Sequence, residues 1–101
     1  MHLRELTEEM NRFVSAKGWY RADSPRQQTP RNLAISLVLE ASEVLEHFQW
    51  RDTTEDTPAL AAELADVTLY LLQLASVSGI DLEKAVLEKL DHNYTRTWDT
   101  L

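Results

Sequence analysis

The chain has 101 residues, 17 of them acidic and 10 basic, and its net charge at pH 7 is −7. This length suits one domain with one core and excludes a barrel or a doubly wound enzyme. The acidic balance disfavours nucleic acid and anionic membrane surfaces as partners, and the absence of cysteine excludes disulfides, thiol nucleophiles and cysteine-ligated zinc.

All of the excess charge lies in one central window. Between Glu40 and Asp66 there are eight acidic residues and one basic residue, Arg51, so this window alone has a net charge of −7. Such a cluster attracts cations. We expect a soluble cytoplasmic protein, because the sequence shows no apolar signal region and no run of about 18 apolar residues to span a membrane.

Two helices are predicted in the first half of the chain. The first, at roughly residues 2–17, has helical apolar spacing, and Gly18 follows it as a C-terminal capping residue would. Thr29 and Pro30 form an N-cap followed by proline in the first turn, and they open a second helix at roughly 30–50. The connection between these helices combines two aromatic side chains and two arginines with turn-forming residues.

Two further helices are predicted in the second half. A second Thr-Pro pair opens the third helix, at roughly 58–78, and Gly79 ends it. Asp81 is placed to cap a fourth helix, at roughly 82–96. The expected inner face of that helix consists of Leu82, Val86, Leu90 and Tyr94. The sequence has no Asn-Gly or Asp-Gly pair and no sustained alternation, so no hairpin is predicted.

The third helix is apolar on two sides. One stripe contains Leu60, Leu64, Val67, Leu71 and Leu74, and the other contains Ala61, Ala65, Leu69 and Leu72. A helix of this kind is buried on both sides, and four helices offer too few neighbours to bury it. We therefore expect an all-α fold, an antiparallel bundle of about four helices in a single domain of residues 1–101, completed by homo-oligomerisation.

Two pairs of acidic residues share one helical spacing. Glu40 and Glu43 lie three residues apart in the second helix, and Glu63 and Asp66 repeat this spacing in the third. Side chains three residues apart leave a helix on one face, so antiparallel packing can bring four carboxylates together. Because like charges repel, such a group requires protons or a cation. Oxygen ligands without cysteine favour Mg²⁺, or Mn²⁺, over zinc.

Simpler interpretations of these acids stay open. A single pair of glutamates on a helix is most often a solvated surface. Against this, neither Glu40 nor Glu43 has a Lys or Arg four residues later to form an ordinary helix ion pair. His47, four residues after Glu43, is either a surface residue or a partner of the acids.

These motifs resemble a known family. Glu40-Ala-Ser-Glu43, followed by Glu63-Leu-Ala-Asp66, is similar to the E-x-x-E and E-x-x-D signature of the MazG-like, all-α nucleoside triphosphate pyrophosphohydrolases. The Phe-Gln-Trp at 48–50 and the Lys-x-x-x-Asn-x-x-Arg at 89–96 are similar to segments of the single-domain dCTP pyrophosphatase branch of that family.

The resemblance implies an activity and a set of site residues. The activity is the Mg²⁺-dependent hydrolysis of a nucleoside or deoxynucleoside triphosphate to the monophosphate and pyrophosphate, by a homodimer or homotetramer. The implied catalytic metal ligands are Glu40, Glu43, Glu63 and Asp66. The implied substrate-binding residues are Trp19, Asn32, Trp50 and Tyr70 around the base, sugar and site wall, and Lys89, Asn93 and Arg96 at the phosphates.

Two questions stay open at this point. The substrate is dCTP or a wider range of deoxynucleoside triphosphates, because Gln28 stands where close relatives tend to carry histidine. A function of another class is a non-catalytic acidic helical module that dimerises and docks a basic partner through residues 40–66. A hydrolase needs fixed cations near its carboxylates, such as Lys89 and Arg96, and a docking module does not.

Overall fold

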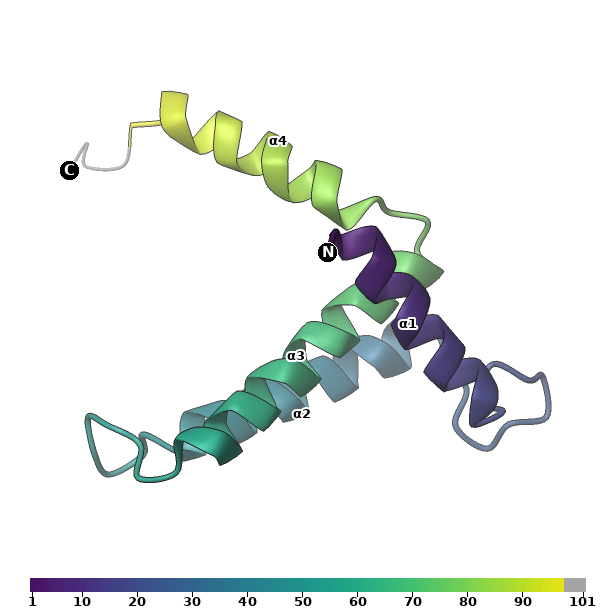
Figure 1. The fold of residues 1–101 in the computed structure, drawn as a ribbon, viewed down its shortest axis with the longest axis horizontal. Coiled ribbons are helices and arrows are strands. Elements are labelled where there is room, and N and C mark those ends of the chain that lie inside the picture. Colours follow the sequence, from purple (N-terminus) through teal and green to yellow (C-terminus); the bar gives the residue numbers. More distant parts are fainter. Residues whose placement is uncertain (98–101) are drawn as a thin grey trace.

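The computed structural model describes residues 1–97, which form four α-helices without a strand among them (Figure 1). The helices are α1 (Leu3–Ala16), α2 (Pro30–Glu46), α3 (Thr57–Val77) and α4 (Leu82–Thr95). The prediction of an all-α fold with four helices is confirmed. The last four residues of the predicted domain, 98–101, lie outside the described part.

Side-chain caps fix where three of the helices begin. Thr29 and Asp81 each accept a hydrogen bond from a backbone N–H in the first turn, as predicted. At α3 the capping residue is Asp56, one position before the predicted Thr57, which is already helical. The aspartate replaces the threonine as cap because its carboxylate accepts a hydrogen bond from the backbone N–H of Ala59, the third residue of the helix.

The predicted helix ends are right for α1 and α3 and wrong for α2. Gly18 (φ +75°) and Gly79 (φ +70°) follow α1 and α3 in the left-handed conformation that glycine adopts most readily. The second helix stops at Glu46, four residues earlier than expected, and residues 47–50 form turns. Trp50 is therefore outside the helix, with 87 % of its surface exposed.

The helices do not close a bundle within one chain. Helices α2 and α3 run antiparallel side by side, α1 crosses the C-terminal end of α3, and α4 projects away from both (Figure 1). Within residues 1–97, α4 contacts α1 and α3 and does not reach α2. The radius of gyration is 16.3 Å, larger than the roughly 13 Å of a compact domain of 100 residues. The single chain thus contains only the α2–α3 part of the predicted bundle.

The core is small and lies where α1 crosses α3. Met10, Val14 and Leu72 are buried together, and three partly buried side chains pack against them. These three are Leu3, Trp19 and Leu82. Asn11 adds a hydrogen bond from its amide to the hydroxyl of Ser76 at 3.1 Å. This junction holds α1 on α3 and places Trp19 beside both.

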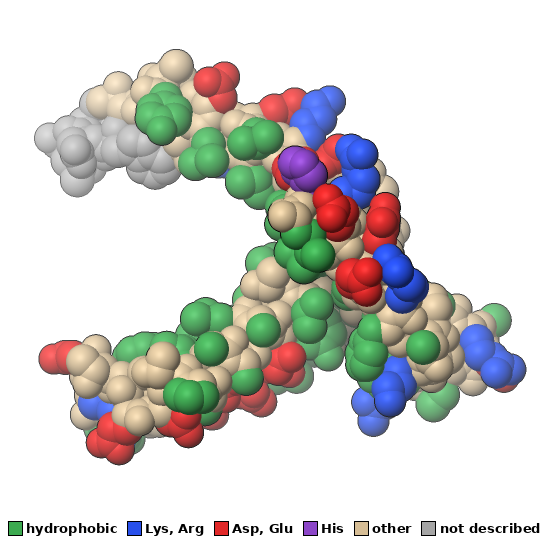
Figure 2. All heavy atoms as spheres, viewed as in Figure 1, with side chains coloured by type: hydrophobic (Ala, Val, Ile, Leu, Met, Phe, Trp, Pro, Cys, Tyr) green, Lys and Arg blue, Asp and Glu red, His purple; other side chains and the backbone are tan. Residues whose placement is uncertain are grey.

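Large apolar side chains remain exposed on α2, α3 and α4. Those on the central and fourth helices include Val38, Leu39, Leu45, Leu64, Leu69, Leu71, Val86, Leu87, Leu90 and Tyr94. Figure 2 shows hydrophobic side chains along the edge of the α2–α3 pair that faces α4 and on the facing side of α4. Of the predicted inner face of α4, only Leu82 packs on the core.

Helix α3 is long and apolar enough, by length and composition alone, to cross a membrane. No segment of this kind was expected from the sequence. The same length and composition occur in the central helix of a water-soluble assembly, and α3 has the acidic residues Glu63 and Asp66 in its first half.

Candidate active site

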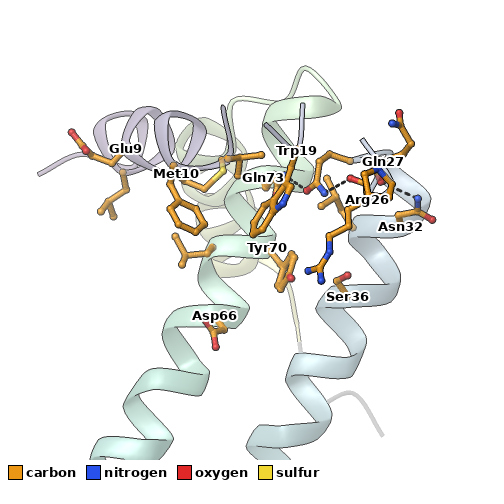
Figure 3. Close-up of a pocket in the computed structure, with 17 residues that line it drawn as sticks. Glu9, Met10, Trp19, Arg26, Gln27, Asn32, Ser36, Asp66, Tyr70 and Gln73 are labelled. Atoms are coloured by element: carbon orange, nitrogen blue, oxygen red, sulfur yellow. Dashed lines mark hydrogen bonds between the residues drawn. The ribbon is translucent and has the colours of Figure 1, made fainter. Parts of the chain in front are cut away.

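A cavity of about 740 Å³ opens between α1, the loop of residues 17–29, α2 and α3 (Figure 3). Four residues predicted to act in a site line it together: Trp19, Asn32, Asp66 and Tyr70. They come from the loop, the first turn of α2 and the middle of α3. The remaining wall is mostly apolar, with the side chains of Arg26 and three glutamines among the polar exceptions.

Trp19 forms one wall of this cavity. Its backbone N–H donates to the carbonyl of Val14 at 3.2 Å, a bond that closes the end of α1 across Gly18. The indole and the Phe13 ring form a T-shaped pair with a centroid distance of 5.6 Å and an interplanar angle of 86°. The guanidinium carbon of Arg26 lies 5.8 Å from the centroid of the indole. The ring is thereby held in one orientation at the cavity wall.

One glutamine organises the loop that carries Trp19. The amide nitrogen of Gln27 donates to the carbonyls of Ser24 at 2.6 Å and of Ala22 at 3.1 Å. The carbonyl of Gln27 in turn accepts from the side chain of Asn32 at 2.9 Å. Asn32 is thus fixed by the loop at the cavity edge, and the loop is fixed by side-chain hydrogen bonds in place of a helix or strand.

A pair of glutamine amides lies at the inner end of the cavity. Gln73 of α3 donates to the side-chain oxygen of Gln28 at 2.6 Å (Figure 3). Only 4 % of Gln73 is exposed, although its side chain is polar. Burial raises the pKa of the neighbouring Tyr20 hydroxyl, and a hydrogen bond with Gln73 acts in the opposite direction. The sequence offered no signal for this pairing, because its partners are 45 residues apart.

The four predicted carboxylates interact electrostatically across α2 and α3. Loss of solvation raises the pKa of the Glu40 carboxyl, and the negative charges of Glu43, Asp66 and Glu63 raise it further, together with a hydrogen bond to Glu43. One oxygen of Glu40, Oε2, is buried without a hydrogen-bond partner among the described residues. The antiparallel pairing therefore brings the two acidic motifs close to each other, as the sequence predicted.

Glu63 is also bound to a histidine. His47, the residue directly after α2, contacts the Glu63 carboxylate through Nε2. Its other ring nitrogen, Nδ1, lies 2.9 Å from the hydroxyl of Thr54. Of the two interpretations of His47 that the sequence left open, the structure supports the partner of the acids.

The oxygen donors of the acidic group suit a hard divalent cation, but their side chains are not yet gathered around one point. Within residues 1–97, no three His, Asp or Glu side chains are already placed to hold one metal ion. The donor set of four carboxylates and the unsatisfied buried oxygen of Glu40 nevertheless suit such a cation, which prefers oxygen ligands. Glu40, Glu43, Glu63 and Asp66 are the residues that would hold it.

Four predicted substrate-binding residues lie away from the cavity. Trp50 is not among the residues that line it and belongs to the exposed turn after α2. The other three, Lys89, Asn93 and Arg96, belong to α4 or directly follow it, and none of them lines the cavity. Because α4 does not reach α2 within the described chain, one chain does not gather all the predicted residues.

The sequence matches the profile of the MazG-like family over residues 35–98. Among individual proteins, dCTP pyrophosphatase 1 of Mus musculus is 43 % identical over 76 residues, which cover 66 % of this chain and 45 % of that protein. The human dCTP pyrophosphatase 1 matches with the same identity and coverage. The match therefore spans less than half the length of these relatives.

A solved structure resembles the whole fold. The crystal structure of a pyrophosphatase from Archaeoglobus fulgidus superimposes with a TM-score of 0.76 and 33 % sequence identity. The superposition covers 92 % of this chain and 89 % of that one. The likeness extends to α1 and the loop after it, beyond the segment that the family profile matches.

Proposed function

We propose, since the chain belongs to the MazG-like family, that it hydrolyses deoxynucleoside triphosphates to monophosphate and pyrophosphate with Mg²⁺. The observation that carries the proposal is the cavity wall shared by Trp19, Asn32, Tyr70 and Asp66. It sets an aromatic, hydrogen-bonding surface next to a group of carboxylates. A nucleotide combines an aromatic base with a polyphosphate and matches both parts. The dCTP pyrophosphatases among the relatives favour dCTP as substrate.

In this proposal the carboxylates hold Mg²⁺, which when bound neutralises the phosphates and activates a water for attack on phosphorus. Mn²⁺ fits the same oxygen ligands. Glu40, Glu43, Glu63 and Asp66 provide the ligands, and their mutual repulsion in the absence of a cation is the physical reason for binding one. Tyr70 and Asp66 lie one helical turn apart on α3, so the aromatic wall and the metal site have a fixed separation.

We also propose that the active protein is a homo-oligomer. The phosphate-binding residues Lys89, Asn93 and Arg96 belong to the α4 end of the chain, and α4 does not reach α2 of the same chain. The apolar edges of α3 and α4 are exposed in the isolated chain and would be covered by another copy. In that assembly α4 of one copy supplies its cations to the carboxylates of another.

The direct test is hydrolysis of the four deoxynucleoside triphosphates with Mg²⁺, with separation of pyrophosphate from orthophosphate. We expect pyrophosphate and monophosphate, and a loss of kcat/KM of about 100-fold or more in Asp66→Asn and Glu40→Gln. Glu55→Gln, an exposed acid of the same negative window that pairs with Arg51, is the charge-matched control and stays active. No turnover of any triphosphate would reject the hydrolase in favour of the docking module.

A further inference from the structure

Arg26 is a cation inside the cavity that the family resemblance does not assign. It is the one Lys or Arg among the residues that line the cavity, which also include Asp66. Among residues 1–97 it forms no ion pair, whereas the neighbouring Arg21 pairs with Asp23 at 3.3 Å outside the cavity. Its guanidinium instead covers the Trp19 ring, 5.8 Å from the centroid.

The backbone of Arg26 is fixed on both sides. Its N–H donates to the hydroxyl of the buried Ser24 at 3.1 Å, and its carbonyl accepts from the Gln28 amide at 2.7 Å. Gln28 is in turn held by the buried amide of Gln73. The side chain of Arg26 extends from this anchored point into the space between Trp19 and α2 (Figure 3). A fixed backbone and an unpaired long side chain make it a positioned cation that can turn without loss of the loop structure.

We infer that Arg26 binds the phosphates of the substrate and leaves the face of Trp19 when the base stacks there. The inference rests on the proposed function and adds a phosphate contact from the same chain as the base pocket. The exchange is favourable because a guanidinium forms paired, charge-assisted hydrogen bonds with phosphate oxygens, which are stronger than its contact with an aromatic ring. The freed indole face then accepts the aromatic base.

This exchange couples recognition of the two ends of the nucleotide. A nucleoside without phosphates must displace Arg26 from Trp19 and offers it no anion in return, whereas a triphosphate provides the anion itself. Removal of the guanidinium should therefore weaken triphosphate binding and leave nucleoside binding unchanged or tighter. A loss of loop structure would weaken the binding of both triphosphate and nucleoside. Comparison of the two ligands therefore distinguishes a phosphate contact from a structural role of Arg26.

The test is calorimetric binding of the four α,β-imido deoxynucleoside triphosphates with Mg²⁺, and of the matching nucleosides, to the full chain. For the base that binds tightest to the wild type, Arg26→Gln should weaken triphosphate binding by roughly tenfold or more. Arg26→Lys keeps the charge but lacks the planar guanidinium, so its affinity for the triphosphate should lie between those of the wild type and Arg26→Gln. Arg21→Gln is the matched control and should bind both ligands within about twofold of the wild type, because Arg21 lies outside the cavity.

Two results would overturn the inference. One is an Arg26→Gln protein that binds the triphosphate as the wild type does. The other is an equal loss for triphosphate and nucleoside, which would make Arg26 a structural residue of the loop. In both cases the wild type still binds the triphosphate, so the proposed function stands. A wild type that binds none of the triphosphates would instead overturn the proposed function, and the inference with it.

Discussion

His47 and Glu63 join the end of α2 to the first half of α3 through a contact between the imidazole Nε2 and a carboxylate oxygen. The other ring nitrogen meets the Thr54 hydroxyl at 2.9 Å. The imidazole therefore bridges the Thr54 hydroxyl and the Glu63 carboxylate, one through each ring nitrogen. The loop between α2 and α3 is thus tied to both of its helices beside the acidic group.

Replacement of His47 by leucine should lower the free energy of unfolding by roughly 1 to 3 kcal/mol, because it removes the imidazole that contacts the mostly buried Glu63 carboxylate and leaves that polar group facing an apolar side chain. Urea unfolding of the metal-free protein measures this. The control is Arg51→Ala, which breaks an exposed ion pair with Glu55 in the same loop and should change stability by less than about 1 kcal/mol. Equal effects of the two substitutions would contradict a special role for the histidine.

Magnesium should stabilise the folded protein through the carboxylate group. At a concentration ten times its Kd, a ligand that binds only the folded state adds about 1.4 kcal/mol, which corresponds to a rise in Tm of roughly 6 to 11 °C for a domain of this size. Asp66→Asn should lose this rise and Glu55→Gln should keep it. Thermal unfolding with Mg²⁺ and with EDTA is the measurement, and a rise preserved in Asp66→Asn would place the cation elsewhere.

The stability of the metal-free protein should fall as pH rises through the raised pKa of Glu40. Because its folded-state pKa lies above the unfolded value, the folded chain holds this proton more tightly. The stabilising contribution is complete below about pH 4, the usual range of a glutamate, and is lost at higher pH. The Glu40→Gln variant has an uncharged amide at this position, so it does not lose this contribution as the pH rises.

Glu40→Gln should therefore be more stable than the wild type at pH 7 in EDTA, and the difference should shrink toward pH 4. Urea midpoints measured across this range give the comparison. A variant less stable than the wild type at every pH would show that the carboxyl of Glu40 supports the metal-free fold. The substitution should also abolish the stabilisation by Mg²⁺, so it separates the two roles of this residue.

The hydrogen bond between the Gln28 and Gln73 side chains should contribute measurably to the stability of the fold. Gln28→Ala removes the acceptor of the Gln73 amide, and a buried donor without a partner costs roughly 1 to 3 kcal/mol of stability. The double variant with Gln73→Leu should lose less than the sum of the two single variants, since no polar group is then left unsatisfied. Strict additivity in urea unfolding would contradict the direct coupling of these side chains.

Two inactive variants should restore activity when they are mixed. If α4 of one copy serves the carboxylates of another, a mixed dimer of Asp66→Asn and Lys89→Ala chains contains one intact site. Random association should then recover about one quarter of the wild-type activity. A mixture of Asp66→Asn with Glu40→Gln should recover none, because both residues belong to the same site of the same chain. No recovery in the first mixture after unfolding and refolding together would reject the shared site.

The number of helices and most of their limits could be predicted, because capping residues and glycines act locally. Thr29, Asp81, Gly18 and Gly79 all function where the sequence suggested. The end of α2 was missed because no glycine or proline stops it, and the apolar pattern continues to Phe48. The helix ends at Glu46, directly before the histidine that binds Thr54 and Glu63, and these contacts appear only in the folded chain.

Part of the spatial grouping of the predicted site residues could be foreseen from the sequence. Trp19, Asn32, Asp66 and Tyr70 do share one cavity. The positions of Arg26 and of the Gln28–Gln73 pair at this cavity were missed, because they depend on the path of a loop without repeating geometry. An apolar face on α4 predicts that the helix packs against something but does not indicate which chain provides the partner, so the separation of α4 from α2 could not be foreseen.

The exposed apolar edges of α3 and α4 also bear on the life of a newly made chain. In the proposed assembly another copy covers these surfaces, so a chain released from the ribosome would expose them until it associates, and chaperones and proteases recognise such surfaces. Association is faster when more chains are present, so slow synthesis would lengthen the time that each chain spends alone and would favour its degradation. Substitutions that weaken association would reduce the amount of protein in the cell before they reduce the turnover of each site.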